Sequence, residues 1–163
     1  YCVNRHHTPR GEKFRHVYEQ ILGRPYTPAV EAGLHQRFEA ATTRQIIDAP
    51  EVPGASAFLE AAARRVVTAL LSSTPQDVLE EIVRRRGWRT RFAAVRGAPV
   101  DKAAWLRSFA AQRGFGCGEV LVFGDTGEDA DAAEAAGCAF VAVGACDPRG
   151  RGMAVPDFTG LRP

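Results

Sequence analysis

The most constraining feature of the sequence is a short apolar run that ends at a glycine and is followed by two acids. Residues 120–123 (Val-Leu-Val-Phe) are apolar and have the length of a buried strand. After Gly124 come Asp125 and Asp129, four positions apart, and then a stretch of strong helix formers that ends at Gly137. A strand, an acidic turn and a helix form one unit of an open α/β sheet, in which ligands bind at the carboxyl ends of the strands.

The two acids admit two interpretations. Asp125 and Asp129 could converge on a hard cation such as Mg²⁺, which takes oxygen ligands and binds few protein carboxylates. They could instead cap the N-terminus of the helix that follows them, where backbone N–H groups lack partners. The rest of the chain has to decide between these two uses.

Composition limits the class of protein. With 163 residues, 45% hydrophobic and 25% charged, the chain fits one globular domain with a small appendage. A net charge of +2 argues against a nucleic-acid partner. No apolar run has the length of a membrane span and no signal-peptide pattern is present, so we expect a cytoplasmic protein without a membrane partner. The four cysteines, which we expect to be reduced, show no CxxC spacing: Cys2, Cys117, Cys138 and Cys146.

Basic residues are strongly biased towards arginine. Of the 21 Lys and Arg residues, only Lys13 and Lys102 are lysine. A lysine kept against this bias points to a need for a compact ammonium group, which arginine does not replace. The bias therefore marks two positions for attention.

The first part of the chain is predicted to be a pair of helices. Apolar residues at helical spacing indicate a helix over residues 11–22. Thr27 as N-cap and Pro28 in the first turn indicate a second helix that runs to about residue 47. Residues 48–54, with two prolines, read as a linker.

Beyond the linker, strands alternate with helices, which predicts βαβ units and a parallel sheet. We expect residues after Gly144 to be irregular, with a short apolar docking piece near residues 155–161. The expected strands are 66–71, 92–95, 120–123 and 139–143, and the expected helices are 55–64, 76–86, 101–113 and 130–136.

Three consecutive strand ends carry polar groups. Ser72 follows the first strand, Lys102 lies near the start of the helix after the second, and Asp125 with Asp129 follows the third. A hydroxyl, an ammonium and paired acids at one sheet edge suit phosphoryl transfer, because they offset the charge on a phosphate and hold its metal. Alone, Ser72 could cap a helix and Lys102 could be a solvated helix residue.

These residues resemble motifs II, III and IV of the haloacid dehalogenase-like (HAD) hydrolases, in the order Ser72, Lys102 and residues 124–129. Residues 52–55 and 72–75 are similar to the phosphoglycolate-phosphatase-like branch. The resemblance implies an α/β fold, a HAD-like Rossmannoid three-layer parallel sheet with a small α-helical cap. Residues 1–48 would be part of the cap and residues 49–163 the core.

The resemblance also implies roles in catalysis. Ser72 would bind the phosphoryl group, and Lys102 would stabilise a phospho-aspartyl intermediate. Asp125 would ligate Mg²⁺, with Asp129 at or next to the metal. The expected activity is a magnesium-dependent phosphatase that hydrolyses a small phosphorylated metabolite.

Further residues would contact the substrate. Ser73 and Thr74 share the box that begins at Ser72, so they are candidates to bind the phosphate. The segment 10–15 resembles a cap-helix signature of the family, which makes Arg10 and Lys13 candidates to meet an anionic substrate.

The family's motif I, a strand that ends in DxDx[TV] and carries the nucleophile, does not occur in the sequence. By the resemblance, that strand would lie in the sheet between the strands at 120–123 and 66–71. We therefore expect a segment of roughly 40–50 residues, one strand and a first cap helix, to lie outside this sequence. Without it, we expect residues 1–163 to be inactive.

Three alternatives remain. A non-catalytic HAD-like phosphate-binding or interaction module would explain the absent nucleophile. A response-regulator receiver domain is disfavoured, because its acids precede the hydroxyl and the lysine in the chain. Dehalogenase chemistry is less favoured within the resembled family, because it needs no metal pair.

Overall fold

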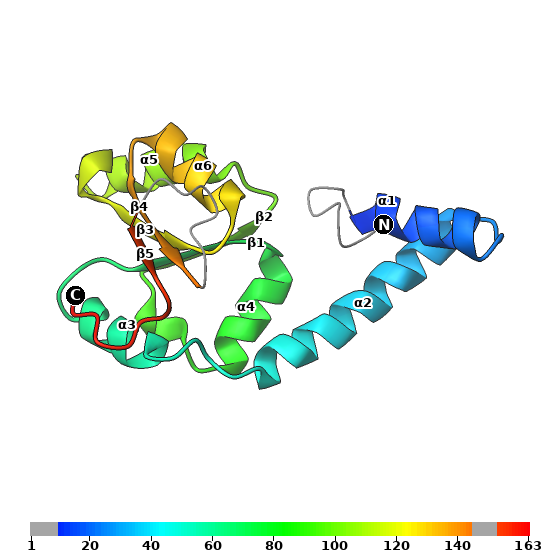
Figure 1. Ribbon diagram of the computed structural model, residues 1–163, viewed down its shortest axis with the longest axis horizontal. Coiled ribbons are helices and arrows are strands. Elements are labelled where there is room, and N and C mark those ends of the chain that lie inside the picture. The colour runs from blue at the N-terminus through cyan, green and yellow to red at the C-terminus, as the bar shows by residue number, and fades with distance from the viewer. Residues whose placement is uncertain (1–9, 145–152) are drawn as a thin grey trace. The chain divides into compact units, whose positions relative to one another are not determined.

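The computed structural model describes residues 10–144 and 153–163 (Figure 1). Cys2 and Cys146 lie outside the described residues. The chain divides into two compact units, Tyr1–Ala49 and Pro50–Pro163. The assignment of cap and core roles to residues 1–48 and 49–163 stays a prediction.

The elements described in the first unit are helical. Its elements are α1 (Arg10–His16), a π-helical turn η1 (Val17–Ile21) and α2 (Pro28–Asp48). Thr27 is the N-cap of α2, its hydroxyl accepts a hydrogen bond from the Val30 N–H (3.3 Å), and a proline opens the helix, so the predicted start is confirmed. The Phe14 ring packs edge-to-face against His35 and Phe38, with centroids 5.3 and 5.8 Å apart. This contact joins α1 to α2.

The second unit alternates strands and helices, and all of its paired strands are parallel. The predicted α/β fold is therefore confirmed. Its helices are α3 (Ala55–Ala63), α4 (Gln76–Arg85), α5 (Lys102–Gln112) and α6 (Gly127–Ala136), with short 3₁₀ turns η2 (Arg89–Arg91) and η3 (Cys117–Glu119). Its strands are β1 (Ala69–Pro75), β2 (Ala94–Ala98), β3 (Leu121–Gly124), β4 (Ala139–Val143) and β5 (Met153–Val155).

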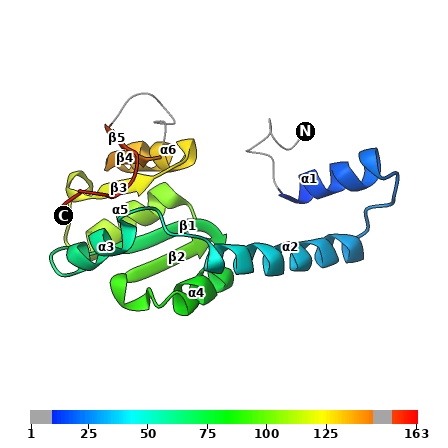
Figure 2. The same ribbon diagram turned by 60° about the horizontal axis from the view of Figure 1, so that its bottom comes forward.

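The strands form two sheets. β1 pairs with β2, and β3, β4 and β5 form a second sheet in that order. Helix α4 packs against the first sheet and α6 against the second (Figure 2). Within the described residues, β1 and β3 each have a hydrogen-bonded strand on one edge only. Leu121, the first residue of β3, is 52% exposed. Strands of parallel sheets are normally covered on both faces.

Three strand predictions were wrong in position or missed. The strand expected at 92–95 runs from Ala94 to Ala98, where its residues pair with β1. The strand expected at 66–71 runs from Ala69 to Pro75, because its limits follow its ladder with Ala94–Ala98 rather than its most apolar residues. Residues 153–155 were expected to be irregular but pair in parallel with Val141–Val143. Three residues among glycines and prolines give too short a pattern for a strand to be predicted. The expectation for residues 145–152 lies outside the described residues.

The C-terminal segment packs onto the second unit through aromatic side chains. Phe158 contacts Phe58 of α3 and Phe123 of β3, with ring centroids 5.2 and 5.3 Å apart. The Phe158 N–H donates a hydrogen bond to the Pro53 carbonyl (2.9 Å). The predicted docking piece near residues 155–161 is therefore confirmed. Among the described residues, the buried apolar core comes from helices α3, α4, α5 and α6, from β4 and from the residue two positions before β2: Ala62; Leu79, Ile82 and Val83; Leu106 and Ala110; Ala133 and Ala136; Val141 and Ala142; Phe92.

None of the described helices combines the length and the apolar character that a membrane span needs.

Gly97 of β2 packs closely against the backbone at the junction of β1 and α4, so a side chain at this position should lower stability. A Cβ atom at Gly97 would lie 2.5 Å from the Thr74 carbonyl oxygen and 2.8 Å from the Gln76 Cα. Both contacts are with backbone, which cannot move aside without disturbing the ladder. We expect Gly97→Ala to lower the free energy of unfolding by about 1–3 kcal/mol in urea denaturation followed by circular dichroism.

The matched control is Gly118→Ala, because a Cβ at Gly118 meets no heavy atom within 4 Å. It should leave the unfolding midpoint nearly unchanged. Equal effects of the two substitutions would contradict the described junction.

Candidate functional site

A buried lysine lies at the centre of the candidate site. Lys102 opens α5, behind the N-cap Asp101, whose carboxylate accepts a hydrogen bond from the Ala104 N–H (2.9 Å). The Lys102 side chain is only 9% exposed, and its Nζ lies 2.9 Å from Asp129 Oδ1. Lysine is almost never buried unless it is paired. The interpretation of Lys102 as a solvated helix residue is therefore wrong.

Asp129 has two functions at the start of α6. Its Oδ2 accepts a hydrogen bond from the Thr126 hydroxyl (2.6 Å), and its own N–H donates to that hydroxyl (3.2 Å), which forms a capping box. Its Oδ1 accepts from Lys102. The helix-capping interpretation is thus confirmed for Asp129, and both oxygens of its carboxylate have partners.

Gly124 permits this arrangement. A Cβ atom at Gly124 would lie 2.5 Å from the Asp129 Cβ and 2.9 Å from its Cγ. Only a residue without a side chain lets the acid five positions after the last residue of β3 fold back over the strand end. The glycine and the spacing of the acids are therefore parts of one packing arrangement.

The two charges stabilise each other against burial. Burial alone would raise the pKa of Asp129, but the hydrogen bonds from Thr126 and Lys102 outweigh it and lower that pKa. Burial alone would lower the pKa of Lys102, but hydrogen bonds and charge from Asp129 and Glu128 raise it. Both groups are therefore ionised at neutral pH.

Glu128 is the residue that the sequence reasoning missed. Its Oε1 accepts hydrogen bonds from the Ser73 hydroxyl (3.2 Å) and lies 3.1 Å from Lys102 Nζ. It thereby links the end of β1 to α5 and α6. Its place in the first turn of α6, next to Asp129, is the signal that could have identified it, since an acid there faces the same strand ends.

The hydroxyl residues of β1 differ in their surroundings. The Ser72 hydroxyl makes local contacts with Thr74, 3.1 Å from its Oγ1 and 3.1 Å from its N–H. Ser73 is the one that reaches the cluster through Glu128. The N-cap of α4 is Pro75, so the interpretation of Ser72 as a helix cap is wrong.

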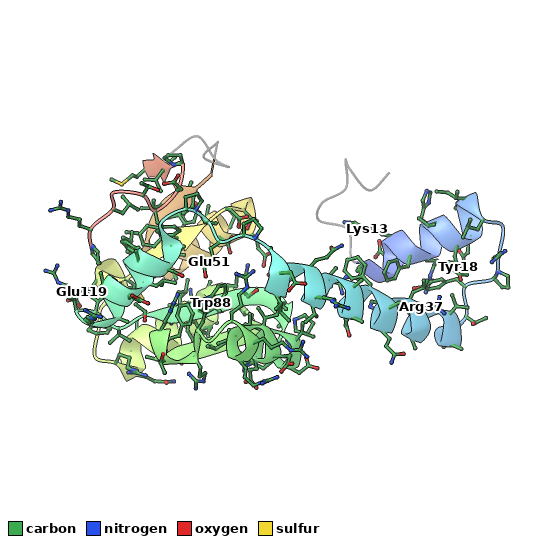
Figure 3. The ribbon with its side chains drawn as sticks, turned by 90° about the horizontal axis from the view of Figure 1, so that it is seen from below. Lys13, Tyr18, Arg37, Glu51, Trp88 and Glu119 are labelled. Carbon is green, nitrogen blue, oxygen red and sulfur yellow. The ribbon has the colours of Figure 1, made fainter. Side chains whose placement is uncertain are left out.

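The remaining candidates belong to the turn after β3 and to the first unit. Asp125 is exposed in the turn between β3 and α6. Lys13 lies on α1 in the first unit (Figure 3), where the Arg10 guanidinium lies 4.3 Å from the centroid of the Phe38 ring. The roles assigned to Asp125, Arg10 and Lys13 stay predictions.

In the part of the chain that the structure describes, no group of three or more His, Cys, Asp or Glu side chains is arranged to hold a metal ion.

Comparison with known proteins identifies the family. A family model described as haloacid dehalogenase-like hydrolase matches residues 10–137. The chain belongs to this family. The HAD assignment covers both units, and the chain shares with the family an α/β structure built on parallel strands. A search of curated proteins finds no match.

Solved structures show the same fold at low sequence identity. A predicted phosphoglycolate phosphatase from Haemophilus somnus 129PT is 18% identical to this chain, with a TM-score of 0.78. The match covers 91% of this chain and 72% of the phosphatase chain. A HAD-superfamily hydrolase of subfamily IA from Geobacter sulfurreducens is 19% identical (TM-score 0.64, 91% and 86% covered). CbbY from Rhodobacter sphaeroides, in complex with xylulose 1,5-bisphosphate, is 15% identical (TM-score 0.70, 94% and 75% covered).

The Lys102–Asp129 pair predicts a pH-dependent contribution to stability. Asp129→Asn keeps the size of the side chain and a capping oxygen but leaves the Lys102 ammonium with less compensation. We expect it to lower the free energy of unfolding by about 1–3 kcal/mol at neutral pH. Because the folded pKa of Asp129 is lowered, the contribution is present above the unfolded pKa and lost as pH falls through the folded one.

Urea denaturation at about pH 7 and about pH 3 tests this, since the difference between Asp129→Asn and the parent should shrink at the lower pH. Asp77→Asn, at an exposed acid in the first turn of α4, serves as control. A loss that is equal at both pH values would show that the charge of Asp129 is not what stabilises the site.

Proposed function

We propose that this chain forms the phosphate-binding and metal-holding part of a magnesium-dependent phosphatase acting on a small phosphorylated metabolite. The observation that carries the proposal is the buried ion pair between Lys102 and Asp129, placed at the carboxyl ends of parallel strands. A buried ammonium at this edge, with hydroxyl groups nearby, suits an anionic ligand.

The proposed roles follow from the contacts. Lys102 stabilises negative charge on the phosphoryl group, and Asp129 holds the ammonium in place. The hydroxyl groups of Ser72, Ser73 and Thr74, at the end of β1, donate hydrogen bonds to phosphate oxygens. Ser73 supports this role best, because its hydroxyl already donates to a carboxylate beside Lys102.

The two acids after β3 suit a magnesium ion if each has a different role. Both oxygens of Asp129 have partners in Thr126 and Lys102, whereas Asp125 is exposed in the adjacent turn. We propose that Asp125 binds Mg²⁺ directly and that Asp129 supports it from the neighbouring position. When bound, the ion would supply positive charge against the phosphoryl oxygens.

The nucleophile is proposed to come from outside residues 1–163. The HAD resemblance assigns it to an aspartate on a strand between β3 and β1, and these two strands have edges without a paired strand in the described residues. The first unit, with Arg10 and Lys13, would be the cap that selects the substrate. The xylulose 1,5-bisphosphate bound to CbbY supports a small phosphorylated substrate for this fold.

Activity of the natural full-length protein tests the proposal. Hydrolysis of p-nitrophenyl phosphate should require Mg²⁺ and should fall by about 100-fold or more in Asp125→Ala, because the charge that offsets the phosphoryl group is lost. Asp77→Ala removes an exposed acid of α4 and should leave the rate unchanged. Activity that survives EDTA would rule the mechanism out.

One observation favours a second candidate. The one DxD pattern in the sequence, Asp129 to Asp131, lies within helix α6 and not directly after a strand. A non-catalytic phosphate-binding or interaction module would bind phosphate or Mg²⁺ without turnover by the natural protein. Binding in calorimetry, together with no hydrolysis at native length, would favour this candidate.

A further inference from the structure

The Glu128 carboxylate lies between two hydrogen-bond donors that suit a phosphate. The Ser73 hydroxyl donates to Glu128 Oε1 across 3.2 Å, and Lys102 Nζ lies 3.1 Å from the same oxygen. Ser73 lies two residues before the end of β1, and Lys102 is the first residue of α5. An oxygen atom that accepts from both is therefore held where the two elements converge.

The two acids that contact Lys102 are held differently. Asp129 is 19% exposed and is fixed by its capping box and by its packing over Gly124. Glu128 is 63% exposed, and the contacts described for its carboxylate are those with Ser73 and Lys102. Glu128 is the exposed member of its pair with Lys102, so water screens its charge and can replace its contacts, and Glu128 can leave at a lower cost than Asp129.

The negative charge of Glu128 opposes the binding of a phosphate at Lys102. One ammonium, Lys102, is shared by the carboxylates of Glu128 and Asp129. A phosphate approaching Ser73 and Lys102 competes with the Glu128 oxygen for both donors and is repelled by its charge. The acid and the phosphate therefore exclude each other from this position.

We propose that the Glu128 carboxylate is an internal anion that occupies the position of the substrate's phosphoryl group between Ser73 and Lys102, and that bound phosphate displaces it. This inference rests on the proposed function, since it places phosphate at the same two donors. It adds a specificity-determining residue. An incoming anion binds only if its contacts with Ser73 and Lys102 are stronger than those of the Glu128 carboxylate. Glu128 therefore excludes weakly binding anions from the site.

Glu128→Gln tests the displacement, because glutamine keeps the length of the side chain and removes its charge. In magnesium-containing buffer, isothermal titration calorimetry with inorganic phosphate should show affinity raised roughly threefold to fivefold, the size expected for loss of an exposed charge interaction. Glu134→Gln makes the same charge change at an exposed position of α6 and should leave the affinity at the parent value. Circular dichroism verifies that each variant is folded.

A second measurement locates the bound phosphate. In protein labelled with ¹³C-lysine, the signal that disappears in Lys102→Arg is identified as that of Lys102. Phosphate should shift this signal in the parent, and at lower phosphate concentration in Glu128→Gln.

The outcomes separate the two proposals. If phosphate shifts the Lys102 signal but Glu128→Gln binds it equally or more weakly than the parent, the displacement is overturned and the phosphate site stands. If neither protein binds phosphate, or if binding leaves the Lys102 signal unmoved, the phosphate site of the proposed function fails and the displacement fails with it.

Discussion

The ion pair between Lys102 and Asp129 is the interaction on which the rest of the second unit depends. Lys102 begins the helix that follows β2, and Asp129 lies in the helix that follows β3, so the pair ties one sheet to the other. Within the described residues, no ladder of hydrogen bonds joins the two sheets. Removing either partner would leave the other as an uncompensated, largely buried charge, which is costly. The pair therefore sets how α5 and α6 meet.

Other contacts reinforce the same junction. The Arg107 guanidinium donates a hydrogen bond to the Ala135 carbonyl (2.9 Å), which again joins α5 to α6. On α3, Phe58 packs edge-to-face on Phe123 of β3, with centroids 5.5 Å apart. The unit is thus held together by helix contacts, the ion pairs of Lys102 and an aromatic cluster. This explains how the polar ends of β1 and β3 come within hydrogen-bond reach although the strands do not pair.

Sequence reasoning worked best where the signal was local. The start of α2 at Thr27 and Pro28, and the end of α6 at Gly137, follow from capping chemistry within a few residues. It was less successful where the partner is distant in the sequence. The limits of β1 and the existence of β5 depend on ladders with residues far along the chain. Within the site, Lys102 stood out by composition, but the contact between Ser73 and Glu128 spans residues that no local pattern connects.

Helix capping and metal binding were the alternatives for Asp125 and Asp129 when only the sequence was considered. Gly124 lets Asp129 cap the helix with one oxygen and hold the Lys102 ammonium with the other. Capping by Asp129 is thus observed, and metal binding by the two acids stays a prediction. Asp125, in the exposed turn, takes no part in that capping box.

The charges of the site bear on the order in which ligands would bind. Asp125, Glu128 and Asp129 bring three carboxylates to the turn and first helical turn after β3, and Lys102 offsets one of them. A phosphate dianion entering this field alone would be repelled, since like charges at short range cost free energy. A divalent cation at Asp125 would cancel the excess, and departure of Glu128 from Lys102 would free the donors. Under the proposed function, we therefore infer that the metal binds before the phosphate and strengthens its binding.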